Sequence, residues 1–131
     1  MRRKNKATEG KTLTFSVPFL PPSFNAYRRC HWAVVRREEK RWKECIYFRW
    51  LELKRPRYEA IRVTLDFCFP DRRNRDLDNY LATGSKLVGD AIKGLFIPDD
   101  SPLYLKGWSF GFYFRSSPET IIKIEEVRKD G

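Results

Sequence analysis

The sequence predicts an α+β fold: a single compact domain in which helices pack on a mixed β-sheet. Four segments alternate apolar and polar residues with the period of two of a β-strand, and two longer segments repeat apolar residues every three to four positions, as a helix does. They follow one another in the order β-α-β-α-β-β, with no internal repeat and no linker. A chain of 131 residues can bury one core without disulfides or a structural metal.

The first half of the chain is expected to form one strand and one long helix. Residues 12–19 alternate in hydrophobicity, and Pro18 places this strand at a sheet edge or near its own end. The two prolines of segment 20–25 predict a loop. A helix is expected over 32–54, and Pro56 stops it. The residues that would face the core are Trp42, Cys45, Ile46, Trp50 and Leu53.

The second half of the chain is expected to begin with a strand. Residues 60–69 place their large apolar side chains on one face. A charged loop, 70–75, leads into a helix expected over 78–93. Asp78 is its candidate N-cap, and Gly94 is its candidate stop signal.

The last two strands are expected over 103–114 and 120–127. The alternation of the first one shifts near Gly107, which predicts a β-bulge at that position. Segment 116–119, SSPE, is a candidate turn that would join the two strands into a hairpin.

Charge is divided unequally along the chain. Residues 1–62 carry 17 Lys/Arg against 6 Glu, a net of +11, whereas residues 63–131 carry 10 against 11 acidic residues, a net of −1. A basic half beside an acidic patch predicts binding to a polyanion such as nucleic acid, although solvated lysines and arginines on an ordinary basic protein would give the same totals. Residues 1–10 are expected to form a flexible basic arm ahead of a domain spanning 11–131.

Several classes of protein are disfavoured by composition. No apolar run approaches the ~20 residues of a membrane span, and no apolar signal region follows the basic N-terminus, so a cytoplasmic location is expected. The three cysteines lack C-x-x-C spacing and predict free buried thiols. A single histidine excludes zinc sites built from several histidines.

Aspartate is concentrated in one part of the sequence. Seven of the eight aspartates lie between Asp66 and Asp100, where none of the nine glutamates lies. Asp76 and Asp78 would point to the same side of an extended chain, so both carboxylates can reach one hard cation such as Mg²⁺ or Mn²⁺. Asp99 and Asp100 follow the helix and would lie about 20 Å away unless the chain folds back along the sheet.

Each aspartate also has a purely structural explanation. Asp78 can serve only as a helix cap, Asp76 can pair with an arginine of the preceding loop, and Asp99 with Asp100 can belong to a turn. A D-x-D pattern alone is a weak signal, and the acidic spacing excludes an EF-hand.

Lys86 lies on the polar stripe of the second predicted helix, together with Asn79, Asp90 and Lys93. From there it could stabilise charge on a scissile phosphate. Alternatively, it pairs with Asp90 on a solvated face.

The ordered motifs resemble one family. The segments PPSFN (21–25) and HWA (31–33), then RDLDN (75–79), then KLVGDAI (86–92) leading to GLFIPDDS (94–101), are similar to the signatures of the RusA family of Holliday junction resolvases, which phages and prophages often encode. In much of that family a lysine follows the asparagine of D-x-D-N by three residues, the position of Ala82 here. Lys86 comes seven residues after it, so the segment LATGS resembles one extra helical turn.

The resemblance implies a small homodimeric endonuclease that depends on Mg²⁺, with Mn²⁺ as a substitute, and that resolves four-way DNA junctions by paired nicks leaving 5′-phosphate and 3′-hydroxyl ends. It implies no membrane and no small-molecule cofactor, in the cytoplasm of a bacterial or phage-infected cell. Asp76, Asp78 and Asp100 would be the catalytic metal ligands, with Asp99 as an acidic neighbour in the metal set. Lys86 would be the catalytic lysine.

The DNA phosphates would lie along Arg and Lys residues of the N-terminal arm, of the 28–43 region and of the loop before the second helix, which position DNA without reading its sequence. The candidate residues are Arg28, Arg29, Arg36, Arg37, Lys40, Arg72, Arg73 and Arg75. His31 and Trp32 are expected to form a packed helix start. The alternative function is a catalytically silent protein of phage replication that binds junctions or single-stranded DNA. In that case aromatic residues such as Trp32 and Trp108 would stack on bases.

Overall fold

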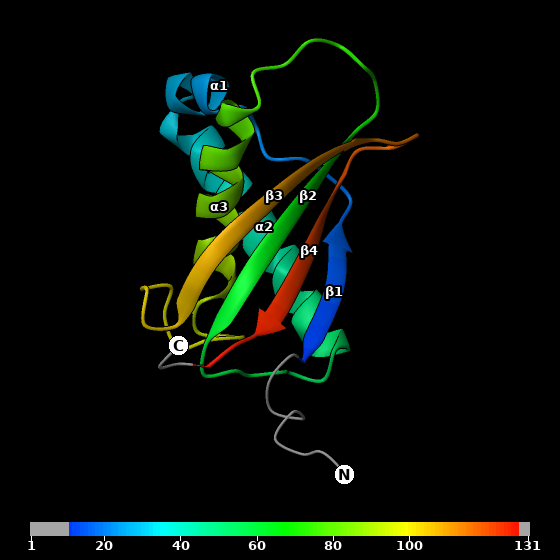
Figure 1. Cartoon of the computed structure of the whole chain (residues 1–131). Helices are drawn as coiled ribbons and strands as arrows, with labels where there is room; N and C mark the ends of the chain where they lie inside the picture. The colour runs from blue at the N-terminus through cyan, green and yellow to red at the C-terminus, as the bar shows by residue number, and fades with distance from the viewer. Residues whose placement is uncertain (1–10, 129–131) are drawn as a thin grey trace.

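In the computed structural model of the chain, which describes residues 11–128, three helices lie against one face of a four-stranded sheet (Figure 1). The predicted α+β class is therefore confirmed, and the arm predicted over 1–10 lies outside the described residues. In chain order the elements are β1 (Thr12–Val17), α1 (Phe24–Arg29), α2 (Trp32–Glu52), β2 (Ile61–Phe69), α3 (Asp78–Ile92), β3 (Leu105–Phe114) and β4 (Glu119–Glu126).

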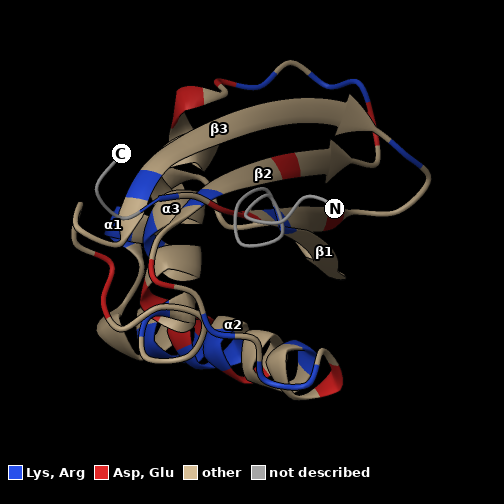
Figure 2. Cartoon of the chain, turned by 60° about the horizontal axis from the view of Figure 1, so that its bottom comes forward, with Lys and Arg blue, Asp and Glu red and all other residues tan. Residues whose placement is uncertain are grey.

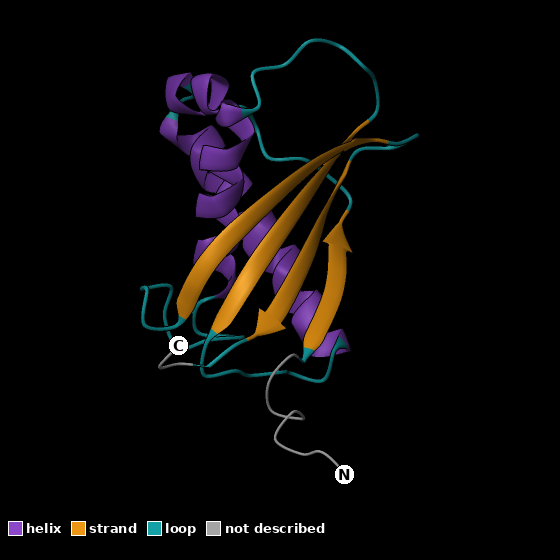
Figure 3. Cartoon of the chain, in the orientation of Figure 1, coloured by secondary structure: helices purple, strands orange, loops and turns teal. Residues whose placement is uncertain are grey.

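The strand order in the sheet is β1-β4-β2-β3, as Figure 3 shows in orange. β2 and β3 are parallel and are joined by α3, whereas β4 is antiparallel to both β1 and β2. The predicted hairpin is therefore wrong, because β3 and β4 follow one another but do not pair. The buried side chains of β4, Thr120, Ile122 and Ile124, favour its position inside the sheet over an edge.

The predicted bulge in β3 is confirmed. Ile61 pairs with Leu105, but Arg62 pairs with Gly107, so Lys106 is the extra residue. A side chain on Gly107 would meet the Arg62 guanidinium, which lies across the strand at this point.

The core lies between the sheet and the helices. The alternate residues of β2 that face α2 and α3 are all buried: Ile61, Val63, Leu65, Phe67 and Phe69. α2 contributes Trp42, Ile46 and Trp50, as predicted, whereas Cys45 and Leu53 are only partly buried. All three cysteines are free thiols, but Cys68 alone is fully buried.

Two local predictions need correction. α1 was not expected, since the prolines of 20–25 predicted only a loop. They precede Ser23, whose hydroxyl accepts the Ala26 N–H at 3.2 Å and starts the helix. The second correction concerns Asp78. It is the first residue of α3 and not its cap, because Leu77 occupies the N-cap position without a side-chain hydrogen bond.

α3 is a continuous helix that packs closely on the sheet. A Cβ on Gly84 would lie 2.7 Å from Cζ of Phe67, so only glycine permits this approach. The predicted stop is confirmed: Gly94 has a φ of 80°, and its N–H donates to the Ile97 carbonyl at 2.6 Å. Within residues 11–128, no helix is long and apolar enough to cross a bilayer.

Candidate active site

Asp76 and Asp78 lie where the loop after β2 enters α3. This is the end of the domain where α1 and the start of α2 also lie (Figure 1). Both side chains are exposed. In the part of the chain that the structure describes, neither carboxylate forms an ion pair or a side-chain hydrogen bond. Two adjacent carboxylates are thus open to solvent at the positive end of the α3 dipole.

Arg75 pairs with Asp71 and not with Asp76. Its Nη2 donates to Oδ1 of Asp71 at 2.8 Å, and its Nη1 donates to the carbonyls of Asp71 and Arg73 at 3.0 and 3.2 Å. The guanidinium also lies 4.3 Å from the ring centroid of Phe69, and the side chain is only 7% exposed. Arg75 therefore holds the loop together. Its predicted role in DNA binding would require these internal contacts to break.

The carboxylate of Asp71 is used within the same loop. It accepts the Arg73 backbone N–H at 3.0 Å, and this bond, followed by the pairing with Arg75, lowers the pKa of Asp71 below its ordinary value. Figure 2 shows basic residues along the middle of this loop, with an acidic residue at each end and another at the start of α3. Because Arg75 pairs with Asp71, it is not available to Asp76, and no other described residue forms an ion pair with Asp76 or Asp78.

Asp99 and Asp100 lie at the opposite end of α3. The chain does fold back after Gly94, but only as far as the fourth turn of the helix. There Oδ2 of Asp100 lies 3.7 Å from the position that a Cβ on Gly89 would occupy. Asp78 and Gly89 are about 16 Å apart along the axis of a regular helix. Among the described residues, no three His, Cys, Asp or Glu side chains are close enough to hold one metal ion.

The fit to a divalent cation is therefore partial. Mg²⁺ is commonly held by one or two carboxylates together with water and substrate phosphate oxygens, and Asp76 and Asp78 are exposed oxygen ligands of that kind. The extended backbone expected between them is not present, however, because Leu77 is helical, with φ −64° and ψ −29°. The i, i+2 spacing therefore no longer places both carboxylates on one side of the chain. The full predicted set of Asp76, Asp78, Asp99 and Asp100 is not brought together within one chain.

Along α3, Lys86 lies between the aspartates at the start of the helix and those at its other end. Its Nζ is 3.2 Å from Oδ2 of Asp90, one turn further along α3, and Lys93 lies 3.9 Å from the same carboxylate. The position of Lys86 is about 12 Å from that of Asp78 along the axis. The pair is exposed, and such pairs contribute only about 0.3–0.5 kcal/mol, so the lysine can leave Asp90 at little cost.

The remaining basic residues of the predicted DNA surface lie on α1, in the first half of α2 and in the loop before α3. Nζ of Lys40 forms an ion pair with Oε2 of Glu44 at 3.9 Å, and Nε of Arg73 lies 3.9 Å from Oδ1 of Asp71. The Arg72 guanidinium lies 4.5 Å from the Phe114 ring centroid. Five arginines of this predicted surface form no ion pair with a carboxylate of the described residues: Arg28, Arg29, Arg36, Arg37 and Arg72.

The structure confirms the helix start predicted at His31 but not the packing predicted for Trp32, although both residues belong to the HWA motif. His31 caps α2, since its Nδ1 accepts the Ala33 N–H at 3.1 Å. Trp32 is not packed as expected, because 65% of its surface is exposed. It lines a pocket of about 540 Å³ between α1, α2 and α3, which the sequence did not predict. The available signal was the place of Trp32 on the charged side of the helix, four residues before Arg36.

Comparison with known proteins adds no assignment. No protein-family model matches the chain, and no curated protein matches it either. The resemblance to the RusA resolvases is carried by the three ordered motifs.

Proposed function

We propose that this protein is a Mg²⁺-dependent endonuclease that resolves four-way DNA junctions by paired nicks in DNA recombination and repair. The observation that carries the proposal is the pair of exposed carboxylates, Asp76 and Asp78, at the end of the domain where α1, the start of α2 and the loop before α3 present five arginines. Within residues 11–128, none of these seven side chains forms an ion pair. Metal-dependent hydrolysis of a polyanion requires carboxylates that hold the metal ion and basic side chains that bind the phosphates.

The side chains divide the work by charge. Arg28, Arg29, Arg36, Arg37 and Arg72 would bind phosphates and position the backbone. Asp76 and Asp78 would hold the cation. When bound, the cation supplies charge stabilisation at the scissile phosphate and lowers the pKa of water. Lys86 would move from Asp90 to a phosphate oxygen, and the products would carry 5′-phosphate and 3′-hydroxyl ends.

A homodimer would bring together aspartates that lie apart in one chain. α3 separates Asp78 from Asp100 within each copy. If a two-fold axis passes through the α3 interface, the two α3 helices run antiparallel. Asp100 of the second copy can then approach Asp78 of the first, and the reverse contact forms the second site. Two equivalent sites also suit a junction, which needs one nick on each of two strands.

The second candidate is a silent protein that binds junctions or single-stranded DNA. It is favoured by one observation: among the described residues of a single chain, no three of the four aspartates lie close enough together to hold one ion. Metal-dependent nicking separates the two functions, because a silent protein binds the same DNA without cutting it.

The test uses an end-labelled four-way junction and a linear duplex with the same arm sequence. Each is incubated with the full chain in Mg²⁺, in Mn²⁺ and in EDTA. We expect symmetric nicks in the junction with either metal, little cutting of the duplex and none in EDTA. Junction binding without cleavage under all three conditions would establish the silent protein instead.

A further inference from the structure

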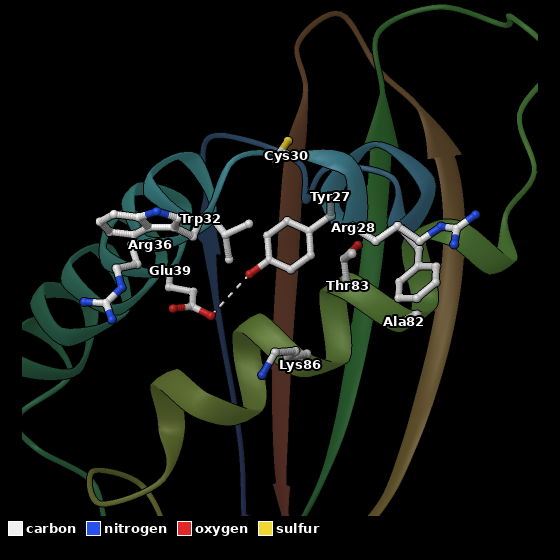
Figure 4. Close-up of a pocket in the computed structure, with 11 residues that line it drawn as sticks. Tyr27, Arg28, Cys30, Trp32, Arg36, Glu39, Ala82, Thr83 and Lys86 are labelled. Atoms are coloured by element: carbon white, nitrogen blue, oxygen red, sulfur yellow. Dashed lines mark hydrogen bonds between the residues drawn. The ribbon is translucent and has the colours of Figure 1, made fainter.

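A pocket beside the candidate active site has the composition of a nucleotide-binding site. It has a volume of about 540 Å³, within the usual range for small-ligand pockets, and it opens between the end of α1, the start of α2 and the middle of α3. Figure 4 shows the Tyr27 ring in the middle of the pocket, with Trp32 on α2 to its left and Lys86 on α3 below it.

Aromatic rings and cations alternate around this pocket. The Arg36 guanidinium lies 5.3 Å from the centroid of the Trp32 ring, and that of Arg28 lies 6.0 Å from the centroid of Phe24. Arg28 and Arg36 lie at opposite sides of the pocket in Figure 4. A planar base could therefore stack on an exposed ring while the flanking phosphates meet a cation on either side.

The interior supplies hydrogen-bonding groups. Tyr27 donates its hydroxyl proton to Oε2 of Glu39 at 3.3 Å. Burial, and then the charge of Glu39, raise the pKa of Tyr27 to about 12, so this hydroxyl stays protonated at neutral pH. Glu39 retains acceptor capacity for a ring N–H or an amino group of a base.

The charge of the pocket decides between possible occupants. Three cations, Arg28, Arg36 and Lys86, line it against one carboxylate, Glu39. An apolar peptide or a second copy covering Trp32 would have to remove these cations from water without compensation. A nucleic-acid strand pairs them with phosphates.

We propose that this pocket binds one unpaired nucleotide of the DNA substrate, with its base stacked on Trp32 and its phosphates held by Arg28 and Arg36. The proposal rests on the DNA-binding part of the proposed function. Ala82 and Lys86, which line the pocket, lie only about 6 and 12 Å along α3 from Asp78. A base inside a duplex cannot enter, so the pocket selects DNA that offers an unpaired nucleotide near the cleavage site.

The test compares Trp32→Ala with Phe48→Ala, a matched control that removes another exposed aromatic side chain from α2, one that is 60% exposed and outside the pocket. Binding of a labelled 12-nucleotide oligo(dT) and of a 12-base-pair duplex is measured in EDTA, where cleavage cannot interfere. Loss of one stacked base predicts that Trp32→Ala weakens oligo(dT) binding about 5- to 150-fold. Duplex binding should change less than about 2-fold, and Trp32→Phe should recover most of the single-strand affinity.

A second measurement locates the contact. An oligo(dT) strand carrying one 5-iododeoxyuridine, irradiated in the complex, should crosslink to the peptide that contains Trp32. Equal oligo(dT) affinities for Trp32→Ala and Phe48→Ala would overturn the pocket while leaving DNA cleavage intact. Loss of the dimer in Trp32→Ala, with unchanged single-strand affinity, would assign the pocket to a second copy. A wild-type protein that binds neither DNA would overturn the proposed function as well.

Discussion

Asp78 begins α3, and the carboxylate of Asp100 lies against Gly89 in the fourth turn of the same helix. A separation of about 16 Å along the axis is far more than one ion can bridge, since Mg²⁺–oxygen distances are about 2.0–2.1 Å. A metal site that uses both carboxylates therefore needs two chains.

The exposed aspartates are predicted to matter for cleavage and not for DNA binding. Asp76→Asn or Asp78→Asn should abolish nicking of the junction, because a cation ligand is lost. Junction affinity should stay the same or increase, because repulsion of phosphate falls. The control is Asp66→Asn, a carboxylate on the opposite face of the sheet from α3, which should cut normally. Gel-based cleavage and binding assays measure both quantities, and near wild-type cutting by Asp78→Asn would refute the metal assignment.

Lys86 is predicted to act in cleavage despite its pairing with Asp90. Lys86→Ala should slow nicking by ~10²-fold or more if the lysine stabilises charge in the transition state. Asp90→Asn removes the ion-pair partner of Lys86 and of Lys93 without removing Lys86 itself, and should retain activity. Ala82→Lys in the Lys86→Ala background should rescue poorly, since that lysine lies one turn closer to Asp78. Single-turnover cleavage rates provide the comparison. A normal cleavage rate for Lys86→Ala would show that Lys86 only pairs with Asp90 on the solvated face of the helix.

The Asp71–Arg75 pair predicts a pH dependence of stability. The backbone N–H of Arg73, and then the guanidinium of Arg75, hold the folded-state pKa of Asp71 below its unfolded-state value. The charged carboxylate therefore contributes its full stabilisation above pH ~4 and loses it as the pH falls through the lowered pKa. Asp71→Asn should therefore lower the melting temperature slightly at pH 6 and cease to do so at pH 2–3. Thermal unfolding of both proteins across this range checks the prediction. A difference independent of pH would show that the pair does not contribute through its charge.

Gly84 is predicted to be a packing residue. Gly84→Ala should lower the free energy of unfolding by about 1–3 kcal/mol, because the new Cβ would clash with the Phe67 ring. Ser85→Ala, on the exposed side of the same turn, should change it by less than about 0.5 kcal/mol. Denaturant titration measures both. A stabilised Gly84→Ala protein would mean that the helix can shift away from the sheet.

The fold could be predicted largely because hydrophobic periodicity determines element type. The apolar faces of β2 and α2, and the shift of alternation at Gly107, each appear directly in the structure. Strand pairing could not be predicted in the same way. Periodicity says which face of β4 is buried but not which strands flank it, and the β2-α3-β3 crossover decides that.

The site was predictable only in part. Residue types and spacing identified Asp76 and Asp78 as candidates, but the choice of Arg75 between two nearby aspartates depends on the shape of the loop. The distance to Asp100 depends on how far the chain returns after Gly94, which spacing alone left open. The pocket at Trp32 depends on the unexpected helix α1, and so no periodic pattern could reveal it.

Mixing two inactive variants tests the central claim, a junction endonuclease whose metal site is shared between two copies. Asp78→Asn and Asp100→Asn homodimers should each fail to cut a four-way junction in Mg²⁺. After subunits are exchanged by denaturation and refolding together, each mixed dimer contains one intact site, formed by Asp78 of one copy and Asp100 of the other. The account predicts that nicking reappears, at up to about one quarter of the wild-type number of sites when the variants are mixed equally. Wild-type protein taken through the same treatment is the positive control. If it cuts while the mixture stays inactive, or if Asp100→Asn alone cuts normally, the shared site is contradicted.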